Sequence, residues 1–186
     1  MIAFDIDGCV NNIKEDLIDI GKNFFEPYKA VFNEKGYYLK EIYAGAPEEK
    51  YKEFWDKFGY KIYTAPPKSG VYETIDFLKK NRILACYITT RNTERCFNNI
   101  FFNEITTKWL KQYDIELPIY YSRDKDTVAD KIGVNLIVED KPENIIRLQK
   151  VTNVLIYKHP YNENMAGNFV ESWIDIKHII ADIYKP

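Results

Sequence analysis

The chain has 186 residues, of which 46% are hydrophobic and 29% charged, and its formal net charge is −2. This length suits one globular domain, or one domain that carries a modest insertion. Because there is no overall basic charge, DNA and RNA polymers are not expected partners, while a mononucleotide stays open.

The chain has three cysteines, Cys9, Cys86 and Cys96, and none belongs to a CxxC motif or a Cys/His cluster. This pattern argues against a disulfide framework and against a zinc site. No run of about 18 apolar residues occurs, and no basic segment leads into an apolar signal region. We therefore expect a cytoplasmic protein that neither spans nor contacts a membrane.

The first ten residues contain a short apolar run followed by a pair of acids. Residues 2–4 read Ile-Ala-Phe, and Asp5-Ile6-Asp7-Gly8 follows directly. Acids spaced i, i+2 on an extended chain lie on one side of it, and Gly8 allows the backbone to turn away. In open α/β sheets, ligands bind beyond the carboxyl ends of strands, which is where these acids would fall. The alternative is a solvated loop after a strand.

Residues 11–66 are predicted to form a helical, aromatic-rich unit. Apolar residues recur at helical spacing over 13–35, where Pro27 should end or kink the helix near Glu26. A second helix is expected from Pro47, with a stop at Gly59. Because Pro66 and Pro67 cannot continue a helix, we place the boundary there. The chain thus divides into a helical cap, residues 11–66, and a core made of residues 1–10 and 67–186.

Beyond the cap, apolar runs alternate with helical patterns. The expected strands cover residues 83–88, 118–121, 134–138 and 153–157, and the expected helices cover 69–80, 93–113, 127–132, 173–184 and a segment opened by Pro142. Strands that alternate with helices imply right-handed crossovers and a parallel sheet with helices on both faces. The fold class is therefore α/β and Rossmann-like, with a small helical cap inserted after the first strand.

Polar residues follow several of the predicted strands. They are Asp5 and Asp7, Thr89, Lys125, and Glu139 with Asp140. Each is ordinary by itself: a lysine is usually a surface charge, and an acid before Pro142 can cap a helix. The carboxyl ends of parallel strands share one edge of a sheet, so these groups should meet. Lys131 is a rival for the lysine position, but it lies inside a predicted helix.

These motifs resemble those of haloacid dehalogenase superfamily phosphatases. Asp5 to Gly8 matches the first motif, Thr89 the second, Lys125 the third and Glu139-Asp140 the fourth. Two departures are Cys9, where Thr, Ser or Val is usual, and Glu139, where Asp is common. Four further segments, 53–56, 88–91, 107–110 and 159–162, are similar to those of bacterial nucleotidases related to the 5'(3')-deoxyribonucleotidases.

The resemblance implies a role for each motif residue. Asp5 would attack phosphorus to form an aspartyl-phosphate, and Asp7 would serve as general acid and base. Thr89 and Lys125 would hold the phosphoryl oxygens. Mg²⁺ would be bound by Asp5, the Asp7 carbonyl and Asp140, with Glu139 in or near its water shell.

The expected substrate contacts are less tightly constrained by the sequence. Thr90 and Arg91 follow the second motif, and Arg91 could equally pair with a carboxylate. The aromatic residues Phe24, Tyr28, Tyr43 and Trp55 could stack on a nucleobase, although an aromatic stripe at helical spacing also suits the core of the cap itself. His159 and His178 show no metal-ligand spacing, so no functional role is assigned to either.

The sequence therefore predicts a Mg²⁺-dependent phosphomonoesterase that acts on a small phosphorylated metabolite. A 5'(3')-(deoxy)ribonucleotidase acting on nucleoside monophosphates is the first interpretation, and a phosphatase of a sugar phosphate or other small metabolite is the alternative. A phosphoacceptor receiver domain would place its lysine after the phosphorylated Asp, whereas here Asp140 follows Lys125. A dehalogenase would not need Asp7, and a non-catalytic binding protein would not need the complete set. The sequence does not indicate an oligomeric state.

Overall fold

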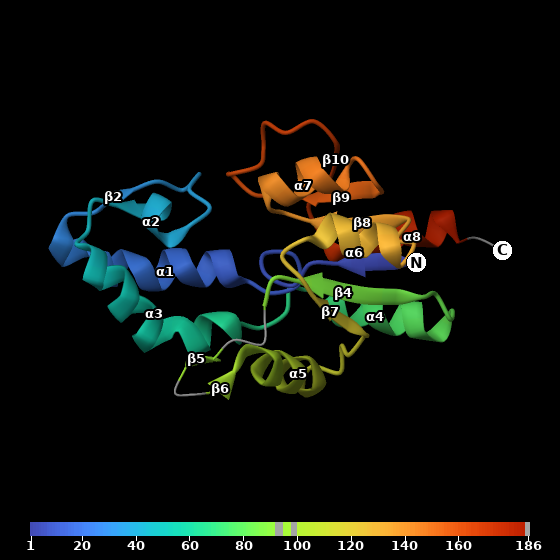
Figure 1. The fold of residues 1–186 in the computed structure, drawn as a ribbon, viewed down its shortest axis with the longest axis horizontal. Helices are drawn as coiled ribbons and strands as arrows, with labels where there is room; N and C mark the ends of the chain where they lie inside the picture. The colour runs from blue at the N-terminus through green and yellow to red at the C-terminus, as the bar shows by residue number, and fades with distance from the viewer. Residues whose placement is uncertain (92–94, 98–99, 185–186) are drawn as a thin grey trace.

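The computed structural model describes residues 1–91, 95–97 and 100–184, and its centre is a six-stranded parallel sheet (Figure 1). The strand order is β10-β9-β8-β1-β4-β7. The strands are β1 (Ile2–Phe4), β4 (Ala85–Thr89), β7 (Ile119–Tyr121), β8 (Leu136–Glu139), β9 (Asn153–Tyr157) and β10 (Asn168–Val170). In register, Ala3 pairs with Cys86 on one side and Ile137 on the other, so β1 lies between β4 and β8. The predicted α/β class is confirmed.

Helices cover both faces of this sheet. They are α4 (Val71–Lys80), α5 (Phe102–Gln112), α6 (Lys125–Lys131), α7 (Pro142–Leu148) and α8 (Trp173–Ile183). Because successive strand residues point to opposite faces, Ile2 and Phe4 join the cluster that includes Trp173 of α8, whereas Ala3 joins the cluster under α6 and α7. Among the described residues, no helix combines the length and the apolarity that crossing a bilayer requires.

The segment between β1 and α4 forms a unit beside the sheet, drawn in blue to blue-green in Figure 1. It contains α1 (Ile13–Phe25), the 3₁₀ turn η1 (Glu26–Tyr28), β2 (Val31–Phe32), α2 (Leu39–Ile42), β3 (Tyr43–Ala44) and α3 (Glu48–Tyr63). Helix α1 ends directly before Glu26, where Pro27 was expected to interrupt it. The unit packs around its own apolar cluster, which includes Leu17, Phe25 and Phe54. The boundaries at residues 11 and 66 remain a prediction.

Several local predictions were wrong. Residues 95–97 (β5) and 100–101 (β6) pair as an antiparallel hairpin, and helix α5 begins only at Phe102, so the expected helix over 93–113 is too long. Residues 93, 94, 98 and 99 of that prediction lie outside the described residues. Gly59 does not end α3, which continues to Tyr63 before the prolines. The cap also contains the β2–β3 pair, and strand β10 was not expected, because strands of two or three residues carry too little pattern to stand out.

Candidate active site

The carboxyl ends of three adjacent strands bring the predicted motif residues together. Asp5 follows β1, Thr89 ends β4, and Glu139 ends β8 with Asp140 directly after it. Lys125 joins them as the first residue of α6. All five side chains are buried. Residues as far apart in the sequence as Asp5 and Asp140 thus form one polar group at the edge of the sheet.

Lys125 lies between two of the carboxylates. Its Nζ is 2.6 Å from Asp5 Oδ1 and 2.7 Å from Glu139 Oε2. Burial by itself would lower the pKa of Lys125, but the charges of Asp5 and Glu139 outweigh burial and raise it above its ordinary range. The ammonium therefore stays charged. The rival Lys131, near the other end of α6, is exposed to solvent.

Glu139 is fully engaged by hydrogen bonds within the protein. Its Oε1 accepts from the backbone N–H of Asp140 at 3.2 Å and of Lys141 at 3.0 Å. Its Oε2 accepts from Lys125 and from Asn144 Nδ2 at 3.3 Å. With these partners, Glu139 holds Lys125 and the start of the next loop in place.

Asp5 and Asp140 carry negative charge that Lys125 does not fully offset. Burial and the neighbouring Glu139 raise the pKa of Asp5 to about 7, despite the opposing effect of Lys125. Burial, Glu139 and Asp5 raise the pKa of Asp140 well above its usual range. Such a group of buried oxygens favours a bound cation.

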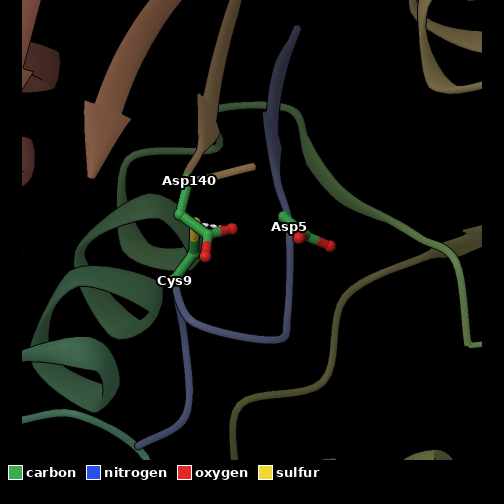
Figure 2. Close-up of side chains that lie close together, drawn as sticks. All are labelled: Asp5, Cys9 and Asp140. Carbon is green, nitrogen blue, oxygen red and sulfur yellow. Dashed lines mark hydrogen bonds between the residues drawn. The ribbon is translucent and has the colours of Figure 1, made fainter. Parts of the chain in front are cut away.

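The donor atoms near Asp140 fit an oxygen-preferring divalent ion. One ligand atom from each of Asp5, Cys9 and Asp140 lies within 4.8 Å of the others, and Figure 2 shows the Cys9 side chain directly beside that of Asp140. Burial and the nearby carboxylates raise the pKa of the Cys9 thiol well above its usual range, so this group stays a neutral thiol and the carboxylates are the charged donors. Gly8 permits this arrangement, because a Cβ there would lie 2.2 Å from Asp140 Oδ2. The residues present therefore fit a divalent ion such as Mg²⁺, and Asp5 and Asp140 are the carboxylates that would hold it.

Asp7 is paired with Arg91. The Nε of Arg91 lies 3.1 Å and 3.0 Å from the two oxygens of Asp7, and its Nη2 also donates to the carbonyl of Tyr63 at 2.9 Å. The guanidinium carbon is 5.4 Å from the ring centroids of both Tyr63 and Trp109. Of the two roles left open for Arg91, the structure shows the carboxylate pairing. The backbone N–H of Arg91 also donates to Thr89 Oγ1 at 3.2 Å, which orients that hydroxyl.

A cavity of about 230 Å³ lies between these acids and the cap. Asp5, Asp7 and Asp140 line its polar side. Its other polar and aromatic lining side chains include Lys14, Tyr37, Tyr38, Trp55, Tyr63, Thr90, Lys141 and Tyr161. The rings of Trp55 and Tyr63 are stacked with centroids 5.5 Å apart. The cavity thus combines carboxylates, lysines and aromatic faces.

The structure separates the predicted substrate-contacting residues into two groups. Trp55 and Thr90 line the cavity. Phe24, Tyr28 and Tyr43 instead pack in the apolar cluster of the cap. The Tyr43 ring stacks on Phe25 with centroids 4.9 Å apart, which leaves it 3% exposed. The second group does not reach the cavity.

The loop after β9 supplies contacts that sequence reasoning missed. The Tyr161 hydroxyl donates to Asp140 Oδ2, and Asn162 Nδ2 donates to the Asp140 carbonyl at 2.8 Å. His159 Nε2 lies 2.9 Å from the Gly8 carbonyl. Burial lowers the pKa of His159 to about 4, so the neutral ring donates this hydrogen bond. The available signal was a polar His-Pro-Tyr-Asn segment at the carboxyl end of a predicted strand.

Two lysines of the cavity were also missed. Lys14 Nζ donates to the Gly36 carbonyl and lies 5.2 Å from the ring centroid of Tyr161. Burial lowers the pKa of Lys14 to about 8. Lys141 Nζ donates to the Tyr38 hydroxyl at 2.7 Å, which joins the core to the cap.

Comparison with known proteins identifies the fold. No protein-family model matches the sequence. A nucleotidase of Clostridium acetobutylicum is 24% identical over 191 aligned positions, which cover 99% of this chain and 95% of the relative. A predicted phosphoglycolate phosphatase of Haemophilus somnus superposes with a TM-score of 0.63 at 16% identity and 97% coverage of each chain.

A hydrolase of the haloacid dehalogenase family from Deinococcus radiodurans, solved with bound phosphate and sodium, superposes with a TM-score of 0.62 at 13% identity. That match covers 97% of this chain and 94% of the other. The chain therefore has the fold of haloacid dehalogenase superfamily hydrolases, and the resemblance drawn from its four motifs extends to the three-dimensional structure.

Proposed function

We propose that this protein is a Mg²⁺-dependent phosphomonoesterase whose nucleophile is Asp5. The observation that carries the proposal is the buried group of Asp5, Lys125, Glu139 and Asp140, which opens onto a cavity covered by the cap. Phosphoryl transfer depends mainly on positioning and on charge stabilisation, and this group supplies fixed charges of both signs.

The charges around the cavity support a phosphate dianion as the ligand. Three carboxylates and two lysines line it, and one further carboxylate and two further cations lie behind them in ion pairs that begin at the lining acids, so the formal charges of the eight groups balance. The carboxylates belong to Asp5, Asp7, Glu139 and Asp140, and the cations to Lys14, Arg91, Lys125 and Lys141. A divalent cation held by Asp5 and Asp140 adds two positive charges, which one phosphate dianion neutralises. By that count, the ion-loaded site suits one phosphomonoester group.

The proposed reaction has two displacements. An Asp5 carboxylate oxygen forms a bond to phosphorus while the bond to the leaving oxygen breaks. Asp7, which takes up a proton from solvent when it turns away from Arg91, gives that proton to the leaving oxygen. Asp7 then takes a proton from a water molecule that attacks phosphorus, so the bond to Asp5 breaks and inorganic phosphate leaves. The cation, when bound, offsets the repulsion between the Asp5 carboxylate and the phosphate dianion.

The surrounding side chains prepare these steps. Arg91 holds the Asp7 carboxylate at the cavity wall, and we expect Asp7 to turn from it toward the leaving oxygen when substrate binds. Lys125 forms an ion pair with Asp5 in this structure. When substrate binds, its ammonium would also contact the phosphoryl oxygens and stabilise their negative charge. Thr89, whose Oγ1 accepts from the backbone N–H of Arg91, would donate a hydrogen bond to a phosphoryl oxygen.

The leaving group is proposed to be a nucleoside. Trp55 and Tyr63 offer a stacked aromatic surface in the cavity wall, and stacking on such surfaces accommodates any base. The Clostridium relative named a nucleotidase supports this choice. A small phosphometabolite is the second candidate, because a cavity of about 230 Å³ is smaller than most ligand sites of about 300–1,000 Å³.

Steady-state hydrolysis of nucleoside monophosphates, sugar phosphates and phosphoglycolate, with and without Mg²⁺, tests the proposal. We expect Mg²⁺-dependent turnover that falls by about 10³-fold or more in Asp5→Asn, which lacks the nucleophile. Trp55→Ala should raise KM for nucleotides more than for the smaller substrates. Undiminished turnover by Asp5→Asn would contradict the mechanism, and equal losses on all substrates in Trp55→Ala would favour the small-metabolite alternative.

A further inference from the structure

Tyr161 connects the cap to Asp140, the carboxylate assigned to the cation. Its hydroxyl donates to Asp140 Oδ2 from the loop after β9. The Tyr37 ring, from the cap, makes a T-shaped contact with the Tyr161 ring, with centroids 5.1 Å apart and planes at 88°. Tyr161 thus touches the cap through its ring and the catalytic edge of the sheet through its hydroxyl.

The Tyr161 ring is held from three directions. His159 stacks on it nearly parallel, with centroids 5.0 Å apart and planes at 11°. The ammonium of Lys14, on the first turn of α1, lies 5.2 Å from the centroid, and Tyr37 supplies the third contact. Two of the three neighbours therefore belong to the cap, so these ring contacts depend on where the cap lies against the core.

Asp140 depends on the Tyr161 hydroxyl for its orientation. Its Oδ1 faces the Cys9 thiol at 3.7 Å, which is a long contact to a weak donor. Its Oδ2 accepts from the phenol, which is a stronger donor, and Asp140 is 1% exposed. Without that hydroxyl, the carboxylate would have no strong side-chain donor among the residues that the structure describes, and it would be free to turn.

We propose that Tyr161 is a positioning residue that orients Asp140 for the divalent cation and couples that orientation, through Tyr37, to closure of the cap. The inference rests on the proposed function for the identity of the cation. Hydrogen-bond partners of metal ligands orient them, and their loss typically weakens metal binding about 10–100-fold. Because coupling is reciprocal, cation binding also favours the closed cap.

Calorimetric titration with Mg²⁺ tests the first part. Tyr161→Phe keeps the ring and removes only the hydroxyl, so its Kd for Mg²⁺ should rise about 10–100-fold. The matched control is Tyr157→Phe, since Tyr157 ends β9 nearby but its hydroxyl donates to the Glu171 carbonyl at 3.3 Å. The control should bind Mg²⁺ as the wild type does. Unchanged or tighter binding by Tyr161→Phe would overturn the proposal.

A second variant tests the coupling to the cap. Tyr37→Leu removes the ring contact with Tyr161, and its Kd for Mg²⁺ should rise several-fold. This variant also serves as the test if Tyr161→Phe fails to fold. In the double variant, Tyr37→Leu should add nothing to the effect of Tyr161→Phe, because the lost contact no longer reaches Asp140. Full additivity would show that the two tyrosines act independently and would overturn the coupling.

Failure of this inference can be told apart from failure of the proposed function. Mg²⁺ titration requires no turnover, whereas hydrolysis of p-nitrophenyl phosphate by the wild-type protein reports on the function alone. If the Kd pattern holds and no phosphate ester is hydrolysed, Tyr161 still positions Asp140 and only the proposed function falls. At saturating Mg²⁺, Tyr161→Phe should regain most of its kcat, since its defect is in cation binding.

Discussion

Lys125→Met tests most directly how much the ion pairs of Lys125 with Asp5 and Glu139 stabilise the protein. Lys125 is 2% exposed and contacts both Asp5 and Glu139, and Met has a similar length and shape without the charge. Removing one partner of a buried ionic group leaves uncompensated charge and typically costs about 3–5 kcal/mol. We expect a loss of that size in the free energy of unfolding at about pH 8 without metal.

The cost should depend on pH in a definite direction. The pKa of Asp5 is about 7 with Lys125 present, and loss of the ammonium raises it further. At about pH 5.5, Asp5 is largely protonated in both proteins, so only Glu139 loses its cation. The cost should therefore be about 1–2 kcal/mol smaller than at about pH 8.

Urea unfolding with EDTA present, at both pH values, measures this. Lys131→Met is the matched control, because Lys131 is exposed on the same helix α6, and it should change the free energy of unfolding by less than about 0.5 kcal/mol. An equal cost of Lys125→Met at the two pH values, or one below about 1 kcal/mol at the higher pH, would refute the argument.

Two further pH effects follow from the same buried groups. The pKa of Asp5 is about 7 and that of Asp140 is also raised, so Mg²⁺ must displace protons from these carboxyl groups at lower pH. The affinity for Mg²⁺ should therefore fall about tenfold or more per pH unit below 7. Calorimetry in buffers of different ionisation enthalpy measures the protons released, and a Mg²⁺ affinity that does not change with pH would contradict this prediction. Burial lowers the pKa of His159 from 6.5 to about 4. As the pH falls from 6.5 to about 4, the unfolded chain therefore binds a proton at His159 before the folded protein does. The folded protein loses roughly 3 kcal/mol of stability over this pH range through His159. His159→Gln should flatten the acid side of a plot of unfolding free energy against pH, and parallel curves for the two proteins would show the reasoning to be wrong.

Local sequence pattern was sufficient for five of the six strands of the sheet and for the motif residues at its edge. Apolar runs alternate with helical spacing, and right-handed crossovers then leave a parallel sheet as the favoured arrangement. Because the carboxyl ends of parallel strands lie at the same edge of a sheet, the sequence alone predicted that Asp5, Thr89 and Asp140 lie close together. Lys125 could be preferred over Lys131, because Lys131 lies inside the helix predicted over 127–132, whereas Lys125 precedes that helix.

Tertiary structure decided what covers those residues and what they contact. Helical spacing identifies an apolar face but not its partner, so Trp55 at the cavity and Tyr43 in the cap's own cluster could not be told apart. The pairing of Arg91 with Asp7 and the contact of Tyr161 with Asp140 join residues far apart in the sequence. The sequence by itself therefore determined the α/β scaffold and its polar edge, whereas the closed cap, its cavity and the orientation of Asp140 depend on long-range packing that no local pattern encodes.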